Sequence, residues 1–289
     1  MKPIDPKPAF AGRTILITGG TRGIAAQIAL DLVAQGASVC VSHSEKHDAQ
    51  AGFAGSAKTF VEGINAQGGH AVAIDQDMGT PDAGTALAQK AIALCGAIDS
   101  LVLSASIQIE KPLAQQTNAD IELQYRINLT SNIELLNAFL PAMAEADFGR
   151  VLAIGSVQET VPSPNMPIYA MTKAAMANLF SNIAREYAPQ GVTFNTLSPG
   201  LIETDRNTAK RDDPERWAAM QHGANPMSRA GTPSETSPSA IHLLSEQASF
   251  ITGANLVVSG GAHLGRANPA DSARHPISRR PDTNQGSAK

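Results

Sequence analysis

The sequence has little of several features that would mark a specialised class of protein. Its two cysteines, Cys40 and Cys95, are too few for a disulfide framework and show no C-x-x-C spacing. Charged residues make up only 17% of the chain, and a net charge of -4 gives no general reason to bind a nucleic acid or an anionic membrane. No run of about 18 apolar residues is present, so no membrane-spanning helix is expected. The first residues lack the apolar stretch of a signal peptide, and we expect a cytoplasmic protein.

Apolar residues make up 43% of the 289 residues, which is enough for a large core. At roughly 150 residues per domain the length suggests about two domains, although α/β folds of about 250 residues often form one. No linker-like break interrupts residues 13–261. We therefore expect a single domain over 13–261, an N-terminal extension over 1–12, and a Pro/Arg-rich tail over 262–289 that is loosely held or packs on a partner subunit.

Short apolar runs alternate with longer segments of helical periodicity. The runs interpreted as buried strands are Thr14–Ile17, Val39–Val41, Ala71–Ile74, Leu101–Leu103, Val151–Ile154 and Val192–Leu197. Helical periodicity covers about 24–35, 53–64, 81–94, 121–143 and 169–187, with an interruption expected at Pro141. Repeated strand–helix–strand units with apolar strands predict an α/β fold, a doubly wound parallel sheet covered by helices on both faces.

A glycine-rich turn, Thr18–Ala25, joins the first expected strand to the first expected helix. Glycine lets the backbone turn sharply and approach a pyrophosphate, while the helix N-terminus supplies oriented N–H groups. Glycine pairs are also common in plain loops. The position of this turn, at the start of an alternating chain, favours a nucleotide phosphate site.

In this turn the sequence resembles the short-chain dehydrogenases/reductases, whose turn is Thr-Gly-x-x-x-Gly-x-Gly. Thr18, Gly19 and Gly23 match this pattern, and Ala25 replaces the third glycine. The third position mainly permits close packing of helix on strand, so alanine should be tolerated. The resemblance covers residues 13 to about 261 and implies a Rossmann fold that binds a nicotinamide dinucleotide.

Four residues match the catalytic set of that family. Tyr169 and Lys173 are four positions apart, which places both on one helix face. The ammonium group is expected to lower the tyrosine pKa from about 10 toward neutral. Ser156, which precedes Tyr169 by thirteen positions, would hydrogen-bond the substrate oxygen, although a serine after a strand can also be a cap. Asn128 matches the asparagine that bends the fourth helix and holds a water linked to the lysine; a local backbone bond is the alternative.

The resemblance also implies a set of cofactor contacts along the chain. They are Gly19, Thr21, Arg22, Gly23, Ile24, Ser42, Ser44, Asp77, Met78, Ser104, Ala105, Tyr169, Lys173, Pro199, Gly200, Ile202 and Thr204. One departure is that the family usually has Asn-Asn-Ala-Gly after the fourth strand, where this chain has Leu103-Ser104-Ala105-Ser106.

We expect the cofactor to be NADP(H) rather than NAD(H). A carboxylate at the end of the second strand would bind the adenosine ribose and repel a 2′-phosphate. The second strand ends at Ser42–Ser44, and the next acid along the chain is Glu45. Arg22 in the turn, with Ser42 and Ser44, is expected to face the 2′-phosphate, although Arg22 could also be a solvated turn residue.

Other residues carry weaker signals. His43 and His47 are four positions apart, but no third ligand is placed nearby, so no metal site is expected. Trp217 and Met220 lie in a segment, 211–221, that the family uses as a substrate lid; ordinary helix packing is the alternative. Residues 157–159 and 162–167 are expected to line the substrate pocket.

The resemblance implies an NADP(H)-dependent enzyme that interconverts a secondary alcohol and a ketone, with Tyr169 as general acid/base. One alternative is a 3-oxoacyl-[acyl carrier protein] reductase, but such reductases usually present basic residues where this chain has Glu145, Asp147 and Gln190. Another is a regulatory protein that binds NADP(H) without turnover, which would need no acid–base tyrosine. A homotetramer is expected, paired through the helices that carry Asn128 and Tyr169.

Overall fold

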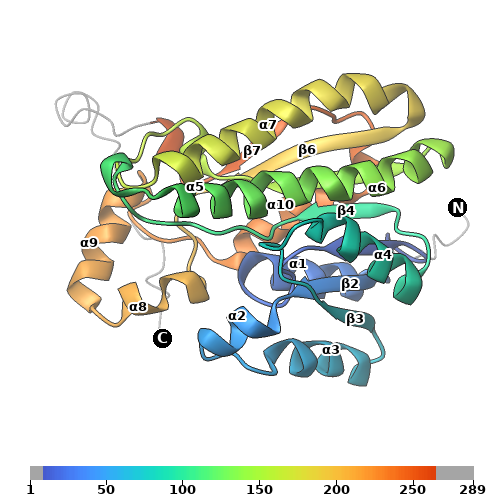
Figure 1. The fold of residues 1–289 in the computed structure, drawn as a ribbon, viewed down its shortest axis with the longest axis horizontal. Helices are drawn as coiled ribbons and strands as arrows, with labels where there is room; N and C mark the ends of the chain where they lie inside the picture. Colours follow the sequence, from blue (N-terminus) through green and yellow to red (C-terminus); the bar gives the residue numbers. More distant parts are fainter. Residues whose placement is uncertain (1–8, 265–289) are drawn as a thin grey trace, which may run out of the picture.

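The computed structural model describes residues 9–264, so most of the expected N-terminal extension and C-terminal tail lie outside the described residues. Within residues 9–264 a seven-stranded sheet has the order β3-β2-β1-β4-β5-β6-β7, and all its strand pairs are parallel (Figure 1). The chain runs outward from β1 to β3 and then crosses to β4 on the other side of β1. The strand order therefore reverses between β1 and β4, which confirms the doubly wound parallel sheet.

The bounds of the elements follow the expected alternation. The strands are β1 (Thr14–Ile17), β2 (Ser38–His43), β3 (His70–Asp75), β4 (Ser100–Leu103), β5 (Gly149–Ile154), β6 (Val192–Pro199) and β7 (Asn255–Val258). The helices are α1 (Gly23–Ala34), α2 (Glu45–Gln50), α3 (Ser56–Ala66), α4 (Ala83–Cys95), α5 (Asn118–Tyr125), α6 (Ser131–Glu145), α7 (Pro167–Tyr187), α8 (Thr208–Arg211), α9 (Pro214–Ala224) and α10 (Pro233–Leu244). None of these helices, over residues 9–264, is long and apolar enough to span a bilayer.

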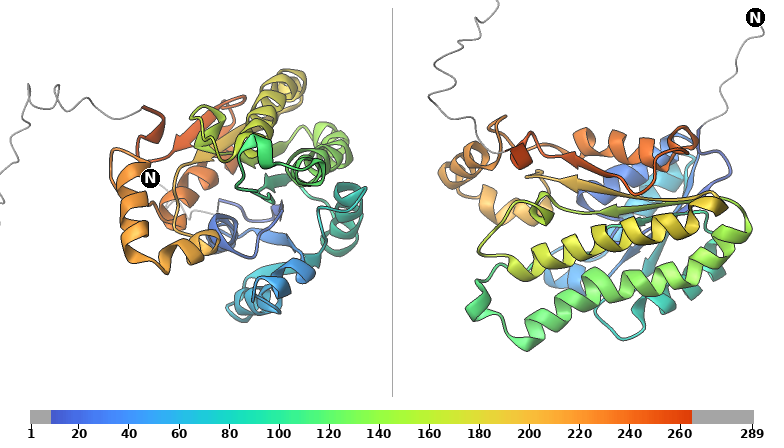
Figure 2. Two further views of the ribbon diagram at one scale, coloured as in Figure 1. Left: turned by 60° about the vertical axis from the view of Figure 1, so that its left-hand side comes forward. Right: turned by 90° about the horizontal axis from the view of Figure 1, so that it is seen from above.

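Helices cover both faces of the sheet (Figure 2). On one face α4, α6 and α7 pack through a core that includes Leu87, Leu135 and Phe180. On the other face α1, α3 and α10 pack through a core that includes Ile28 and Leu244. All four residues of β4 are buried, because both faces of this central strand are covered. This burial explains why the strands show as continuous apolar runs in the sequence.

Several elements were not expected from the sequence, among them the helices α8, α9 and α10 after β6, the helix α2 and the strand β7. A separate helix, α2, precedes the helix expected over 53–64, and Phe53 lies between α2 and α3. The residues of α2, Glu45–Gln50, are almost all polar, so they carry no apolar period. The edge strand β7 is only four residues long and is half exposed, so its pattern is weak as well.

The break expected at Pro141 occurs elsewhere, so that prediction is wrong. Helix α6 continues through Pro141 to Glu145, with Phe139 and Met143 buried in the core. Burial of this apolar face outweighs the backbone hydrogen bond that a proline removes. The actual break is a π-helical turn at Arg126–Thr130, which separates α5 from α6.

Helices α4 and α6 approach each other closely at Gly84. A Cβ at this position would overlap the backbone oxygen of Ser131 and lie 2.6 Å from the Cβ of Glu134. The N–H of Gly84 donates to the Glu134 carboxylate at 2.8 Å. Gly63 in α3 is the opposite case, because a Cβ there would meet nothing within 4 Å.

Alanine at these two glycines should therefore change stability in opposite directions. Alanine is favoured over glycine in a helix by about 0.5–1 kcal/mol, so Gly63→Ala should raise the free energy of unfolding by up to that amount. Gly84→Ala gains the same preference but overpacks the contact, which typically costs about 1–3 kcal/mol. Urea unfolding of both variants measures the difference. A Gly84→Ala protein more stable than the wild type would contradict the close contact of α4 with α6.

Candidate active site

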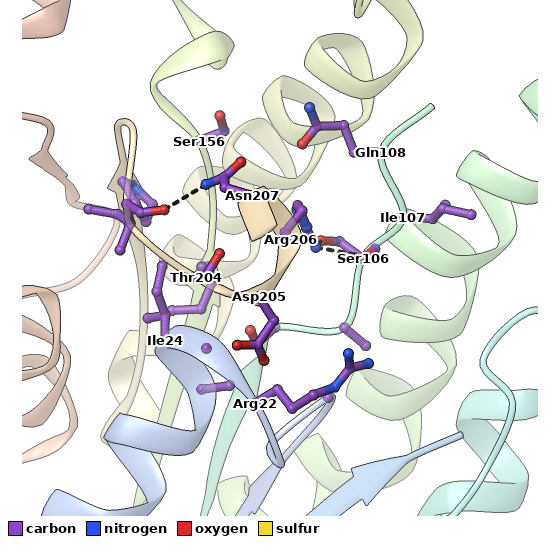
Figure 3. A pocket seen from close by; sticks show the side chains of 18 of the residues that line it. Arg22, Ile24, Ser106, Ile107, Gln108, Ser156, Thr204, Asp205, Arg206 and Asn207 are labelled. Carbon is purple, nitrogen blue, oxygen red and sulfur yellow. Dashed lines mark hydrogen bonds between the residues drawn. The ribbon is translucent and has the colours of Figure 1, made fainter. Parts of the chain in front are cut away.

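A cavity of about 1080 Å³ opens at the carboxyl edge of the sheet, beside the ends of β1, β4, β5 and β6. Parallel α/β sheets bind ligands at this edge, next to the reversal of strand order. The volume lies at the upper end of small-molecule sites, about 300–1000 Å³. Every residue expected to contact a cofactor lines this one cavity, and so does Ser156. Figure 3 shows Arg22 and Ser156 at opposite ends of the view, with Thr204 to Asn207 between them.

The glycine-rich turn brings the start of α1 against the end of β4. Gly19 has a φ of +63°, and a Cβ there would lie 3.2 Å from the Cα of Ala105. The N-terminus of α1 begins after Arg22 and has no side-chain cap, so its first N–H groups remain free for an anion. These features fit the pyrophosphate of a dinucleotide.

The segment Ser104-Ala105-Ser106 after β4 departs from the family pattern, but its contact with the end of β1 is intact. The Thr18 hydroxyl oxygen accepts hydrogen bonds from the backbone N–H groups of Ser104 at 2.9 Å and Ala105 at 3.0 Å. Because these are backbone donors, they do not depend on the side chains that differ from the family. The loop is thereby fixed against β1.

Arg22 is not a solvated turn residue, and an acid does lie beside it. Its guanidinium donates to the carboxylate of Asp48 at 2.6 Å and lies over the Phe53 ring, 4.4 Å from the centroid. Asp48 is buried, and His43 Nδ1 lies 3.3 Å from its other oxygen. The expectation of no carboxylate near the end of the second strand is wrong, because α2 folds back and places Asp48 there.

The two serines expected to face a 2′-phosphate have other contacts. The Ser42 hydroxyl oxygen accepts from the backbone N–H of Gly19 at 3.2 Å, so it supports the glycine-rich turn. The Ser44 hydroxyl lies 3.0 Å from His47 Nδ1. Both residues still line the cavity, and Arg22 remains the strongest donor at this end.

Tyr169 and Lys173 lie on the inner face of α7, and both are buried. The Lys173 ammonium group donates to the backbone oxygen of Ile154 at 2.7 Å, at the end of β5. Its nitrogen lies 5.7 Å from the centroid of the Tyr169 ring. Helix α7 thus brings the two side chains to the same end of the cavity.

Burial determines how these two groups hold their protons. Burial raises the pKa of Tyr169, and this effect outweighs the lowering by the Arg206 charge and by hydrogen bonding to the Ser156 and Arg206 side chains. Burial also lowers the pKa of Lys173 to about 7, with Arg206 lowering it further and Glu159 raising it. The expected lowering of the tyrosine pKa by Lys173 is therefore wrong for this arrangement.

Ser156 follows β5 and has two structural roles. Its hydroxyl oxygen accepts from the N–H of Gln158 at 3.2 Å and caps a short 3-10 helix, Val157–Glu159. The same side chain lines the cavity with Tyr169 and lowers the pKa of that tyrosine. The carboxylate of Glu159 accepts from the N–H of Ser156 at 2.9 Å and from the side chains of Ser198 and Asn255. Glu159 therefore holds Ser156 in place from behind.

Asn128 does not line the cavity but supports it from behind. Its side chain accepts from the N–H of Ile107 at 2.8 Å and donates to the Ile107 oxygen and the Thr172 hydroxyl, both at 3.0 Å. The Asn128 backbone oxygen accepts from Asn132 at 3.0 Å. The side-chain bonds reach the loop after β4 and helix α7, so the alternative of a purely local backbone bond is wrong. Asn128 lies in the π-helical turn, as the bent helix of the family implies.

Several cavity residues were missed from the sequence. Arg206 lies two positions after Thr204, within the same loop as a matched family motif, and that position was the available signal. Helices α8 and α9 flank the cavity, and Lys210 on α8 pairs with Glu110 across it at 2.5 Å. Of the two expected lid residues, Met220 lines the cavity and Trp217 does not.

The segments 157–159 and 162–167, which were expected to line the substrate pocket, line the cavity only in part. Residues of both segments line the cavity: Val157, Gln158, Pro162, Ser163 and Met166. Within residues 9–264 no group of three or more His, Cys, Asp or Glu side chains could hold a metal ion. His43 and His47 instead lie near carboxylates of Asp48 and Asp77.

The sequence matches one protein-family model over residues 19–263, a model described as enoyl-(acyl carrier protein) reductase. A solved structure titled a 3-oxoacyl (acyl-carrier-protein) reductase from Agrobacterium tumefaciens C58 with NADP bound is 38% identical, with a TM-score of 0.82 over 88% of this chain and 96% of that one. A gluconate 5-dehydrogenase from Burkholderia cenocepacia J2315 in complex with NADP and tartrate is 29% identical, with a TM-score of 0.80 over 90% and 98% of the two chains.

A relative from Escherichia coli (strain K12), described as a cyclic-di-GMP-binding biofilm dispersal mediator protein, is 33% identical over 87% of this chain and 98% of its own. The three similar proteins thus carry three different descriptions on one fold, so similarity alone does not identify a substrate. The match of the family model, together with the parallel sheet and its edge cavity, shows that the chain belongs to the short-chain dehydrogenase/reductase family.

Proposed function

We propose that the protein is an NADP(H)-dependent oxidoreductase that interconverts a secondary alcohol and a ketone. One observation carries this proposal: a single cavity has the glycine-rich turn at one end and the side chains of Ser156, Tyr169 and Lys173 at the other. A binding protein would need only the first end. The other end has the buried Tyr169 hydroxyl, which can donate a proton, and the Ser156 hydroxyl, which can hydrogen-bond a substrate oxygen. Reduction of a carbonyl group needs both functions.

The cofactor end is supported by the residues already described. The free N–H groups at the start of α1 would hold the pyrophosphate, and Arg22 would bind the 2′-phosphate that distinguishes NADP(H) from NAD(H). Two of the similar structures contain bound NADP, which supports the same choice. Asp48 favours NAD(H) instead, because its carboxylate forms an ion pair with Arg22 and so competes with a 2′-phosphate for that guanidinium.

The nicotinamide cofactor supplies the hydride, and the residues of the chain orient the substrate and move the proton. Ser156 would hold the substrate oxygen, and Tyr169 would give it a proton during reduction or take one during oxidation. The raised pKa of Tyr169 keeps its proton in place at neutral pH, which suits reduction. Asn128 fixes α7 through Thr172, and thereby positions Tyr169.

A second candidate is a 3-oxoacyl-[acyl carrier protein] reductase, favoured by the structure that is 38% identical. In the sequence, Glu145 and Asp147 argue against this candidate, because such reductases usually have basic residues at these positions. These two residues lie near the amino-terminal end of β5, and Gln190 lies just before β6, at the edge of the sheet opposite the cavity. Their charges therefore do not decide what enters the cavity of the same chain. Turnover of 3-oxoacyl thioesters against free ketones separates the two candidates.

A homotetramer is part of the proposal, and the outer surface of α5, α6 and α7 supports it. Leu123, Tyr125, Ile133 and Met171 are each 37–44% exposed on these three helices. Ala175 is exposed on α7, one helical turn after Met171, so the two share a face. An apolar helix face of this kind is typical of a protein–protein interface.

Tyr169→Phe should abolish turnover and leave the fold and the affinity for NADPH nearly unchanged. The variant loses one hydroxyl, and a general acid is typically worth 10²–10⁴-fold in rate. Tyr187→Phe is the matched control, since Tyr187 packs against Phe194 away from the cavity. The measurement is kcat over a panel of ketones and alcohols. Retention of more than about a tenth of wild-type kcat by Tyr169→Phe would contradict the assignment; a wild type that binds NADPH without turnover would favour the regulatory alternative.

Arg22→Ala and Asp48→Asn should move cofactor preference in opposite directions. A charge-assisted hydrogen bond is worth about 1.5–3 kcal/mol, so Arg22→Ala should weaken NADPH about 10- to 100-fold, with a smaller effect on NADH. Asp48→Asn removes the carboxylate that shares Arg22, so NADPH should bind more tightly. Lys46→Ala is the control, because this exposed cation of α2 does not line the cavity. The test is kcat/KM for both cofactors; equal loss of both in Arg22→Ala would show that Arg22 does not face the 2′-phosphate.

Light scattering should give a mass of about four chains of 30.1 kDa for the wild type. Ala175→Arg should reduce that mass, because a symmetric interface would bring like charges together on the α7 face. Ala66→Arg on α3 is the control and should not change the mass. A monomeric wild type at micromolar concentration, or a tetrameric Ala175→Arg, would contradict the proposed interface.

A further inference from the structure

Arg206 lines the cavity and points toward Ser106 (Figure 3). It belongs to the loop after β6, and its Nη2 donates to the backbone oxygen of Ser106 at 3.2 Å and to the Ser106 hydroxyl at 3.3 Å. The side chain is therefore fixed to the β4–α5 loop, in the cavity that Tyr169 also lines. The positive charge of this guanidinium favours the ionised form of Tyr169 and disfavours that of Lys173, so it acts on both side chains.

Arg206 differs from Arg22 and Lys210, two other cations of the cavity, because it has no carboxylate partner. Arg22 pairs with Asp48 at 2.6 Å, and Lys210 pairs with Glu110 at 2.5 Å. Lys173 is buried on a backbone oxygen. No Asp or Glu oxygen of residues 9–264 lies within 4 Å of the Arg206 guanidinium.

The acids that line the cavity do not supply that partner, since neither Asp205 nor Asp212 forms an ion pair with Arg206 and Asp48 pairs with Arg22. Glu159 accepts from the Ser156 N–H, the Ser198 hydroxyl and the Asn255 amide, so its charge is satisfied behind Ser156. Arg206 also repels the ammonium form of Lys173, an unfavourable placement for two cations. A guanidinium held there without an anion suits a ligand that brings one.

We propose that Arg206 binds a carboxylate of the substrate, and that the substrates are short 2- or 3-hydroxy acids and the corresponding oxo acids. A guanidinium fork matches a carboxylate through two parallel hydrogen bonds. Arg206, Ser156 and Tyr169 line the same cavity, and the charge of Arg206 acts on Tyr169, so a carboxylate on Arg206 would lie near the carbon whose oxygen Tyr169 serves. This inference rests on the oxidoreductase function proposed above. In the reduction, Tyr169 gives its hydroxyl proton to the carbonyl oxygen of the oxo acid while the carbonyl carbon takes a hydride from NADPH; this leaves the hydroxy acid, NADP⁺ and a phenolate that regains a proton from water, and oxidation runs the same step in reverse.

The proposal separates acids from neutral analogues of the same shape. Lactate, 3-hydroxybutyrate and gluconate are each compared with their amides, and kcat/KM is measured with NADP⁺ for the wild type, Arg206→Gln and Arg206→Lys. Arg211→Gln is the matched control, because Arg211 follows on α8, carries the same charge and does not line the cavity. Circular dichroism and NADPH affinity establish that each variant is folded.

The expected result is a preference of the wild type for at least one acid over its amide. Arg206→Gln should lower kcat/KM for the acid about 10- to 100-fold, mainly through KM, and change the amide within about threefold. Arg206→Lys should restore part of the preference, because a lysine keeps the charge but not the fork. An equal loss for acid and amide, or a wild type that prefers amides or 3-oxoacyl thioesters, would overturn the proposal.

A binding measurement keeps this inference distinct from the proposed reaction. The same acids are titrated calorimetrically into wild type and Arg206→Gln saturated with NADP⁺. Acid binding that is lost in Arg206→Gln, without turnover in the wild type, would support the carboxylate site and contradict the redox function. Absence of acid binding to the wild type would overturn the site itself, whatever the enzyme turns over.

Discussion

One hydroxyl holds the carboxyl ends of β1 and β4 together, and the cavity depends on that junction. Thr18 accepts from the backbone N–H groups of Ser104 and Ala105, while Gly19 lies against Ala105 because it has no Cβ. From this fixed point the glycine-rich turn and the β4–α5 loop diverge, one toward the cofactor end and the other toward Ser106. The junction uses backbone donors, which explains how the chain can depart from the family sequence there and keep the geometry.

Asn128 connects the fold to the chemistry at the other end of the cavity. The π-helical turn at Arg126–Thr130 interrupts what would otherwise be one continuous helix over 118–145. The Asn128 side chain in this turn is buried. There Asn128 bonds the loop after β4 through Ile107 and helix α7 through Thr172. Three segments far apart in the chain are thus tied to one buried amide, which fixes the position of Tyr169 on α7.

The sequence was sufficient for residues whose position follows from a strand end or a helix turn. Ser156 ends β5 and Tyr169 lies on α7, so the alternating pattern and the family motif place both. The pattern could not reveal Asp48, because α2 is a short polar helix whose return toward Arg22 depends on tertiary packing. Nor could it reveal the role of Arg206, since the distinction between a paired and an unpaired cation requires knowledge of every neighbouring carboxylate. Contacts made by polar side chains across loops carry no periodic signal.

The electrostatics of the cavity follow from burial more than from the motif. Removing Tyr169 and Lys173 from water favours the neutral form of each, which raises one pKa and lowers the other. Arg206 acts in opposite senses on the pair, because its positive charge favours a phenolate and disfavours a second ammonium. An anion bound at Arg206 would cancel part of that charge, and would therefore raise the pKa of Lys173 toward its ordinary value. Binding of the proposed carboxylate substrate and the charge state of Lys173 would in this way be coupled through Arg206.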